Sequence, residues 1–313
     1  MSFDFAPPLP WHDSLWTDIS QSINNDRLSH AMLFSGLSGI GKRHLALSLA
    51  GRLLCSDSAS NQACGHCKSC ELVAAGTHPD FSLLQPIEEG KVIPIADVRK
   101  LISVIDKTSQ QGGWKIAVIH PAESMSNGAA NALLKTLEEP QGKTLIILVS
   151  HRPSLLPATI RSRCQIKTML PPSIEVAKTW LRAIFDDHED TARAIEISKG
   201  RPLLALDYLK TGGLNDYEGF ERVLEAVRLG DISFIDAAQQ CSKLTTSSSL
   251  EWFISYLHYL LKRDEYLQSN QNIYLFADRL NQMHQLVVSG NNINQQLMWE
   301  ELFMSWRQVF FKQ

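Results

Sequence analysis

At residues 36–42 the chain reads Gly36-Leu37-Ser38-Gly39-Ile40-Gly41-Lys42, which matches the phosphate-binding pattern G-x-x-x-x-G-K. The loop stands between an apolar strand candidate at 31–34 and a helical pattern at 42–54, and in that context backbone N–H groups can wrap phosphates. The pattern continues with a Ser or Thr that holds Mg²⁺, but here Arg43 takes that place. An arginine cannot coordinate a cation, and its charge would lie close to where the metal belongs. The sequence therefore predicts a phosphate cradle without its metal ligand.

The residues around this loop alternate strand-like and helical patterns up to about residue 168, which predicts a parallel sheet with covering helices. All but the second expected strand are nearly continuous apolar runs, as is typical of buried parallel strands. The expected strands are 31–34, 81–84, 115–119 and 145–149, and the expected helices are 42–54, 95–108 and 127–138.

After Pro171-Pro172 the pattern becomes helical for the rest of the chain, and Gly212-Gly213 marks a second boundary. We therefore expect a P-loop α/β domain over residues 1–170, a small helical lid domain over 171–210 and an all-helical domain over 211–313. In the last of these, the stretch 250–261 is apolar around most of its circumference. Such a helix is buried inside its own bundle or against another subunit, and both interpretations stay open.

Composition excludes several classes of protein. The chain has 313 residues, of which 44% are hydrophobic and 20% charged, so a folded protein of two or three domains is expected. Its net charge of −3 argues against a protein that mainly neutralises nucleic-acid phosphates. No apolar run is long enough to span a bilayer, and Met1–Phe5 carry no basic region followed by an apolar one. We expect a cytoplasmic protein with no membrane partner.

Four of the six cysteines, Cys55, Cys64, Cys67 and Cys70, form a C-x8-C-x2-C-x2-C cluster. Short C-x2-C steps let thiolates converge on one tetrahedral ion, and four sulfurs close a structural site, so the pattern predicts Zn²⁺. The alternative is a set of reduced surface cysteines, because disulfides are disfavoured in the cytosol.

The expected zinc module spans about residues 55–75 and is an insertion into the first domain. His66 and His78 are interpreted as lying near the metal without binding it. Cys164 and Cys241 are far from the cluster in sequence and are interpreted as ordinary buried thiols.

A second loss accompanies Arg43. A working P-loop ATPase carries an acid at the end of a neighbouring strand, but the strand at 115–119 is followed by His120, and Glu123 stands farther along the loop. Hydrolysis of ATP is therefore not expected. Bound ATP or ADP stays an open possibility, because a phosphate cradle can bind without catalysing, and the glycines also suit a plain strand-to-helix turn.

The decapeptide at 131–140, Asn131-Ala132-Leu133-Leu134-Lys135-Thr136-Leu137-Glu138-Glu139-Pro140, is followed by Ser162-Arg163-Cys164. Together they resemble the clamp-loader ATPases of the AAA+ superfamily. With the cysteine insertion after the phosphate-loop helix, the chain is similar to the bacterial DNA polymerase III clamp-loader subunits. The resemblance implies an AAA+ domain, a lid and an oligomerisation collar, with gamma/tau and delta subunits as partners. The sliding clamp and primed DNA would be reached through the complex.

The resemblance also implies roles for single residues. Arg163 would act as an arginine finger in trans, on ATP held by a neighbouring subunit; the alternative is a surface charge paired with a carboxylate. The polar sensor position corresponds to Ser150 and His151. The arginine with which active members contact their own nucleotide corresponds to Leu203, although Arg201 stands close by.

Three functional hypotheses follow. The favoured one is a non-hydrolysing stator of a clamp loader, meaning a rigid subunit whose neighbours hydrolyse ATP. The second is a competent clamp-loader ATPase of the gamma/tau type that tolerates Arg43. The third is a zinc-dependent nucleic-acid-binding protein, which the net charge and the lack of a basic and aromatic stripe near the cysteines disfavour.

Overall fold

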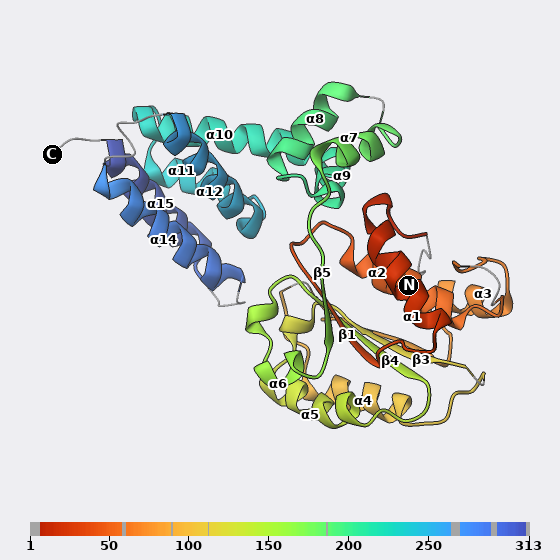
Figure 1. Ribbon diagram of the computed structural model, residues 1–313. Coiled ribbons are helices and arrows are strands. Elements are labelled where there is room, and N and C mark those ends of the chain that lie inside the picture. Colours follow the sequence, from red (N-terminus) through yellow and green to blue (C-terminus); the bar gives the residue numbers. More distant parts are fainter. Residues whose placement is uncertain are drawn as a thin grey trace. The chain divides into compact units, whose positions relative to one another are not determined.

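The first part of the chain is built around a five-stranded sheet in which every neighbouring pair of strands is parallel (Figure 1). The order across the sheet is β2-β3-β4-β1-β5, so β2 and β5 are its edges. The strands are β1 (Ala31–Ser35), β2 (Phe81–Leu84), β3 (Lys115–Ile119), β4 (Thr144–Ser150) and β5 (Gln165–Thr168).

This computed structural model describes residues 7–57, 61–88, 90–111, 113–185, 187–263, 270–288 and 293–310. Met1–Phe5, residues 58–60 of the expected zinc module and the C-terminal Gln313 lie outside them. Contacts divide the chain into two compact units, Met1–Leu206 and Asp207–Gln313. The three-part division at 170 and 210 stays a prediction. Within the described residues, no helix is both long enough and apolar enough to cross a membrane.

Besides the sheet, the first unit contains a series of α-helices. They are α1 (Asp13–Asn24), α2 (Lys42–Leu54), α3 (Lys68–Ala74), α4 (Ile95–Ile105), α5 (Asn127–Glu138), α6 (Ala158–Arg161), α7 (Ile174–Arg182) and α8 (His188–Ile197). Single 3₁₀ turns occur at η1 (Pro10–His12), η2 (Ala122–Ser124) and η3 (Pro153–Leu155). Helix α9 (Pro202–Thr211) begins in the first unit and ends in the second.

Side chains of each central strand point alternately to the two faces of the sheet. In β1, Ala31 and Leu33 belong to a core shared with α4, α5 and α6, whereas Met32 and Phe34 belong to a core shared with α1 and α2. Figure 1 shows these two helical layers on opposite sides of the sheet. Both faces are buried, which explains why β1, β3 and β4 read as continuous apolar runs.

The predicted α/β class and its four strands are confirmed within a residue or two. The fifth strand, β5, was missed, because its side chains are mostly exposed and polar at the edge of the sheet. The helix predicted over 95–108 ends at Ile105, and α5 ends at Glu138, just before Glu139-Pro140 as predicted.

The second unit is all helical. It contains α10 (Gly213–Leu229), α11 (Phe234–Cys241), α12 (Thr246–Arg263), α14 (Gln271–Val288) and α15 (Gln295–Phe310). Aromatic side chains of α10, α12, α14 and α15 meet in one cluster, in which Phe253 lies 5.2 Å from Trp306 between ring centroids. In α12, Trp252 and Phe253 are buried inside this unit. Packing inside this bundle therefore explains most of the apolar side chains of the stretch 250–261, which belongs to α12.

Candidate functional site: a closed glycine loop and a four-cysteine centre

The glycine loop links β1 to α2 in a conformation that only glycine adopts easily. Gly36 has φ +144°, and a Cβ there would lie 2.3 Å from the carbonyl oxygen of Met169, the residue after β5. Gly41 caps α2 in the left-handed region with φ +86°. The positive φ angles and the close approach of the Met169 carbonyl to Gly36 require glycine at these positions.

Two carbonyl groups of the loop accept hydrogen bonds from the N-terminal segment and from α9. The Ile40 carbonyl accepts hydrogen bonds from the indole Nε1 of Trp11 (2.9 Å) and from Nε2 of His12 (3.0 Å). The Gly39 carbonyl accepts one from the backbone N–H of Leu203, at the start of α9 (3.0 Å). The loop is therefore attached on one side to the N-terminal segment and on the other to a helix of the expected lid.

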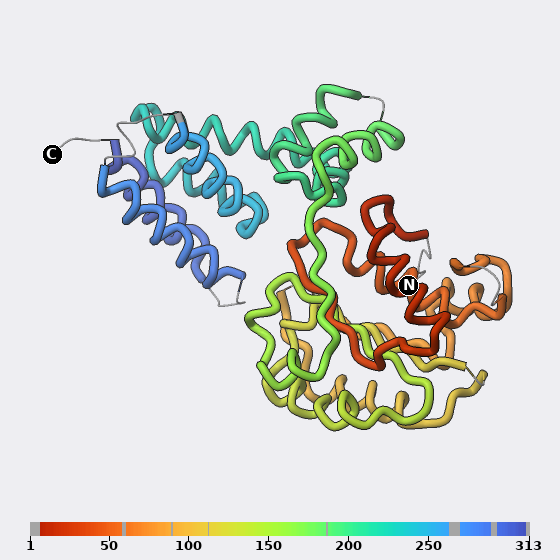
Figure 2. Tube along the Cα trace, viewed as in Figure 1, coloured from red at the N-terminus to blue at the C-terminus, as the bar shows by residue number. Residues whose placement is uncertain are grey.

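The N-terminal segment that makes these bonds is itself packed tightly. Pro7 accepts a hydrogen bond from His44 Nε2 of α2 (2.7 Å), and the Trp11 ring meets Trp180 of α7 edge to face, with centroids 5.2 Å apart. In Figure 2 this segment, drawn in red, runs beside α2. Burial lowers the pKa of His12 to about 4, so its ring is neutral near pH 7.

The lysine of the phosphate-loop pattern, Lys42, is turned into its own loop. Its side chain is buried, and Nζ donates a hydrogen bond to the Leu37 carbonyl. Burial lowers the pKa of Lys42 to about 8, with the nearby Glu123 charge acting in the opposite direction. The ammonium is therefore still mainly charged at pH 7, and part of the phosphate cradle is occupied by an internal contact.

Beside the loop lies a cavity of about 480 Å³, at the carboxyl ends of the parallel strands where α/β proteins bind ligands. Its lining residues are Ser38, Gly39, Gly41, Lys42, Arg43, His44, Leu47, His120, His151 and Leu203. Among these described residues there is no aspartate or glutamate. The cavity thus has Arg43 in the place of the metal ligand and His120 in the place of the acid that a working ATPase needs.

The two histidines that follow β3 and β4 stand side by side in this cavity. The rings of His120 and His151 meet edge to face with centroids 5.2 Å apart. Burial is the main cause that lowers the pKa of each to about 4, and the positive charge of Lys42 contributes to both shifts. At neutral pH both imidazoles are uncharged, so neither supplies the negative charge that polarises an attacking water.

Glu123, considered too distant from the strand end to replace the missing acid, does not line the cavity. It lies in η2, and its Oε1 accepts hydrogen bonds from the backbone N–H groups of His151 (2.9 Å) and Arg152 (3.2 Å). Ser150, one of the two sensor candidates, is buried, and its hydroxyl accepts a bond from Arg152 N–H. Of the two candidates, only His151 reaches the cavity.

Leu203 lines the cavity, whereas Arg201 does not. Arg201 is buried, and its Nε donates to the Ser198 carbonyl at 2.7 Å. The position at which active relatives are expected to carry a nucleotide-binding arginine is therefore occupied by an apolar side chain in this fold.

Arg163 lies away from the cavity, just after α6. Its guanidinium pairs through Nε and Nη2 with Glu138 at the end of α5, and Nη1 donates to the Thr159 carbonyl at 3.0 Å. The side chain stays one-third exposed. The structure thus shows the carboxylate pair, and the role of Arg163 toward a neighbour stays a prediction.

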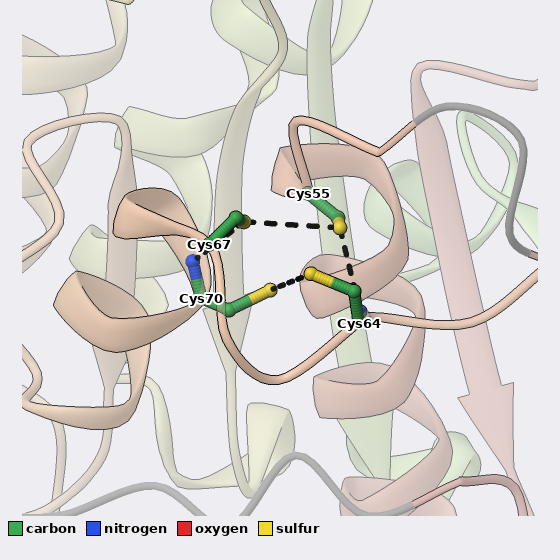
Figure 3. A group of neighbouring side chains, drawn as sticks. All are labelled: Cys55, Cys64, Cys67 and Cys70. Atoms are coloured by element: carbon green, nitrogen blue, oxygen red, sulfur yellow. Dashed lines mark hydrogen bonds between the residues drawn. The ribbon is translucent and has the colours of Figure 1, made fainter.

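The four predicted cysteine ligands come together in one centre (Figure 3). All four Sγ atoms lie within 4.8 Å of one another, with 3.9 Å between those of Cys55 and Cys67 and 4.0 Å between those of Cys64 and Cys70. Zinc–sulfur bonds of about 2.3 Å in a tetrahedron require sulfurs about 3.8 Å apart. The centre therefore has the size to hold a metal ion.

Backbone N–H groups donate to two of the four sulfurs, whereas burial raises the pKa of Cys55 and Cys70. Cys64 N–H points to Cys55 Sγ and Cys70 N–H to Cys67 Sγ, each at 3.4 Å. Although burial works in the opposite direction, hydrogen bonds led by the one from Cys70 N–H lower the pKa of Cys67 to about 6. Cys67 also caps α3, so the helix start and the centre are formed together. Cys164 and Cys241 are buried elsewhere.

A strand order of 2-3-4-1-5, with a glycine loop after β1 and a helix that docks on the loop, defines an AAA+-type P-loop domain. The chain belongs to the family described as "DNA polymerase III, delta subunit", whose model matches residues 11–173.

Similar proteins agree with that family. The "DNA polymerase III subunit delta'" of Pseudomonas aeruginosa is 36% identical over 326 aligned residues, covering 95% of this chain and 96% of its own. The protein of the same name from Escherichia coli is 35% identical, over 63% of this chain and 59% of its own. A DNA polymerase III gamma subunit-related protein of Thermotoga maritima shares the fold, with a TM-score of 0.50, 15% identity and coverage of 95% and 99%. The predicted family is confirmed.

Proposed function

We propose that this chain is a delta'-type subunit of a DNA polymerase III clamp loader, and that it hydrolyses no ATP of its own. One observation carries the proposal: Arg43 and His120 line the cavity in the places of the metal ligand and the acid. Without Mg²⁺, the negative charge that develops on a transferring phosphoryl group lacks its metal counter-charge, and without the acid no side chain at that place holds the metal or polarises the attacking water. Leu203 in the same cavity supports the proposal.

The hydrogen bonds of the loop support a rigid role. The carbonyls of Leu37, Gly39 and Ile40 already have partners within the protein. Movement of the loop away from α9 would break the Gly39 bond, and movement away from the N-terminal segment would break those of Ile40. A buried carbonyl that loses its partner costs about 1–3 kcal/mol. We infer that the loop keeps one conformation through the loading cycle, as a stator requires. Whether ATP or ADP binds there is secondary to this role.

The first test is ATP turnover by the isolated chain. We expect none above the background of a Lys42→Ala preparation purified in parallel. The matched comparison is the double variant Arg43→Thr, His120→Asp, which returns the metal ligand and the acid and is expected to gain Mg²⁺-dependent ATP binding. Hydrolysis by the wild-type chain would instead establish the competent ATPase of the gamma/tau type.

We propose further that the four-cysteine centre holds Zn²⁺ as a structural ion. Four thiolates leave no open position for substrate, and this donor set with this spacing suits zinc best. Metal analysis of the purified full-length protein should return about one zinc per chain, and a Cys67→Ser, Cys70→Ser variant should return none. A folded wild-type protein that is free of zinc would show that the cysteines are simply reduced thiols.

The proposed partners are the gamma/tau and delta subunits, with the sliding clamp and primed DNA engaged through the complex. Two features support assembly: the family to which the chain belongs, and Arg163 at the surface outside its own cavity. In this arrangement Arg163 contacts ATP held by the neighbouring subunit. The decisive reconstitution compares ATP turnover and clamp loading by the other subunits with and without this chain.

A further inference from the structure

The ligands of the four-cysteine centre come from the end of α2, the start of α3 and, for Cys64, the segment between these helices. Cys55 follows directly on Leu54, the last residue of α2, whereas Cys67 and Cys70 belong to the start of α3. Residues 58–60, which lie between these elements in sequence, are outside the described residues. Besides the cysteines, side chains that are not ligands also hold α3 against the end of α2.

One such contact is made by Ser69, which stands between two ligands on α3. Its hydroxyl donates to the carbonyl of Leu54 at 2.5 Å, and its oxygen lies 2.9 Å from Nε2 of His78. Ser69 and His78 are both buried. The bond to Leu54 joins α3 to the residue next to Cys55, so it spans the two halves of the metal centre.

The directions of these hydrogen bonds follow from His78. The backbone N–H of Asp80 donates to His78 Nδ1 at 3.1 Å, so Nδ1 carries the lone pair and Nε2 carries the proton. Nε2 then donates to Ser69, which leaves the Ser69 hydroxyl proton for the Leu54 carbonyl. One neutral tautomer satisfies every donor and acceptor in the series His78, Ser69 and Leu54.

The far end of this series is fixed to the sheet. Asp80, which precedes β2, accepts hydrogen bonds from the Ser109 hydroxyl (2.9 Å) and from the N–H groups of Gln110 (2.9 Å) and Gln111 (3.0 Å). The loop that contains these donors leads into β3. The α/β core therefore fixes the position of His78 through Asp80. The hydrogen bond from His78 in turn fixes the position of Ser69.

We propose that Ser69 and His78 are positioning residues for the metal centre: they hold α3 against the end of α2, so that Cys55 meets Cys67 and Cys70 at tetrahedral spacing. The proposal rests on the proposed zinc role. His78 is not itself a ligand, because both of its ring nitrogens are bonded to Asp80 and Ser69. A variant that lacks either side chain keeps all four cysteines. In such a variant α3 moves away from the end of α2 more easily, so the four sulfurs are held less firmly at tetrahedral spacing.

The test is the zinc affinity of the full-length protein, measured by competition with a chromophoric chelator. Partners behind the ligands typically contribute 10–100-fold in metal affinity, so Ser69→Ala and His78→Ala are each expected to weaken zinc binding by about that factor. His66→Ala is the matched control, because His66 is exposed in the same module and bonds only the nearby Cys64 carbonyl in the described contacts. It should bind zinc like the wild type.

Two conservative variants separate positioning from general damage to the fold. The amide nitrogen of His78→Gln reaches the place of Nε2, whereas the shorter His78→Asn reaches only that of Nδ1, so Gln should recover most of the affinity and Asn should not. Cobalt substitution should give the same thiolate absorption bands in every variant, since the ligand set is unchanged.

Three results would overturn the inference. If Ser69→Ala and His78→Ala fold and bind zinc like the wild type, the positioning role is wrong while the zinc site stands. If His66→Ala loses as much affinity as they do, the losses are nonspecific. A wild-type protein that binds no zinc would reject the zinc role itself, and with it this inference.

Discussion

Arg163→Ala should lower ATP hydrolysis at the neighbouring subunit's site by about 10³-fold, the lower end of the effect of arginine fingers. The guanidinium supplies charge to the transferring phosphoryl group, and a factor of 10³ corresponds to about 4 kcal/mol of transition-state stabilisation. In a reconstituted loader the other sites keep working, so the steady-state rate should fall by the contribution of one site. Single-turnover hydrolysis should resolve the slow site from the others.

The ion pair with Glu138 does not oppose this role. Arg163 is one-third exposed and Glu138 about half exposed, and exposed pairs of this kind contribute only about 0–1 kcal/mol. The roughly 4 kcal/mol available at a neighbour's phosphates is larger, so the guanidinium can leave Glu138 when the subunits assemble. The pair holds Arg163 at the surface near the end of α5.

Two variants distinguish the finger from the ion pair. Glu138→Gln removes the pair but keeps the guanidinium, so ATP turnover by the loader should equal or exceed that of the wild type. Arg163→Lys keeps the charge but loses the planar fork, and it should recover only part of the rate. The complex should assemble in each case, as judged by gel filtration. If Glu138→Gln slows turnover as much as Arg163→Ala does, Arg163 acts through its ion pair and the finger role is wrong.

Sequence patterns predicted the buried parts of the first unit well. Strands β1, β3 and β4 are covered on both faces, so burial alone forces their apolar runs. Strand β5 pairs only with β1 and exposes most of its side chains, so neither face imposes a pattern on Gln165–Thr168. An edge strand such as β5 forms through backbone hydrogen bonds to the adjacent strand, here β1, and these bonds leave no pattern in the side chains.

The site was predictable where a local motif encodes it. The cysteine spacing predicted all four members of the metal centre, and the residues after β3 indicated the missing acid. The bonds that close the glycine loop were not predictable, because Trp11 and Ile40 are 29 positions apart and no motif links them. His78 was interpreted as lying near the metal without a role, and a histidine's partners become visible only in the fold.

In the second unit, Trp306→Ala should lower the free energy of unfolding by about 3–5 kcal/mol, the usual cost of truncating a buried aromatic side chain to alanine. Trp306 is fully buried, its ring lies 4.7–5.4 Å from those of Phe310, Phe253 and Phe276, and its Nε1 donates to the Leu224 carbonyl. The truncation leaves a cavity where four helices meet. Hydrogen exchange resolved to α10–α15 would measure the loss in this unit separately from the first.

The same variant distinguishes two roles for the aromatic cluster: packing within this unit and contact with a partner subunit. Because Trp306 packs within its own unit, Trp306→Ala should destabilise the isolated chain, with or without other loader subunits. Trp306→Phe, which keeps most of the ring contacts, should lose less. Met304→Ala, on the same helix but half exposed, should leave stability nearly unchanged. If Trp306→Ala instead left the isolated chain as stable as the wild type and only weakened assembly, the aromatic cluster would serve a partner subunit rather than the core.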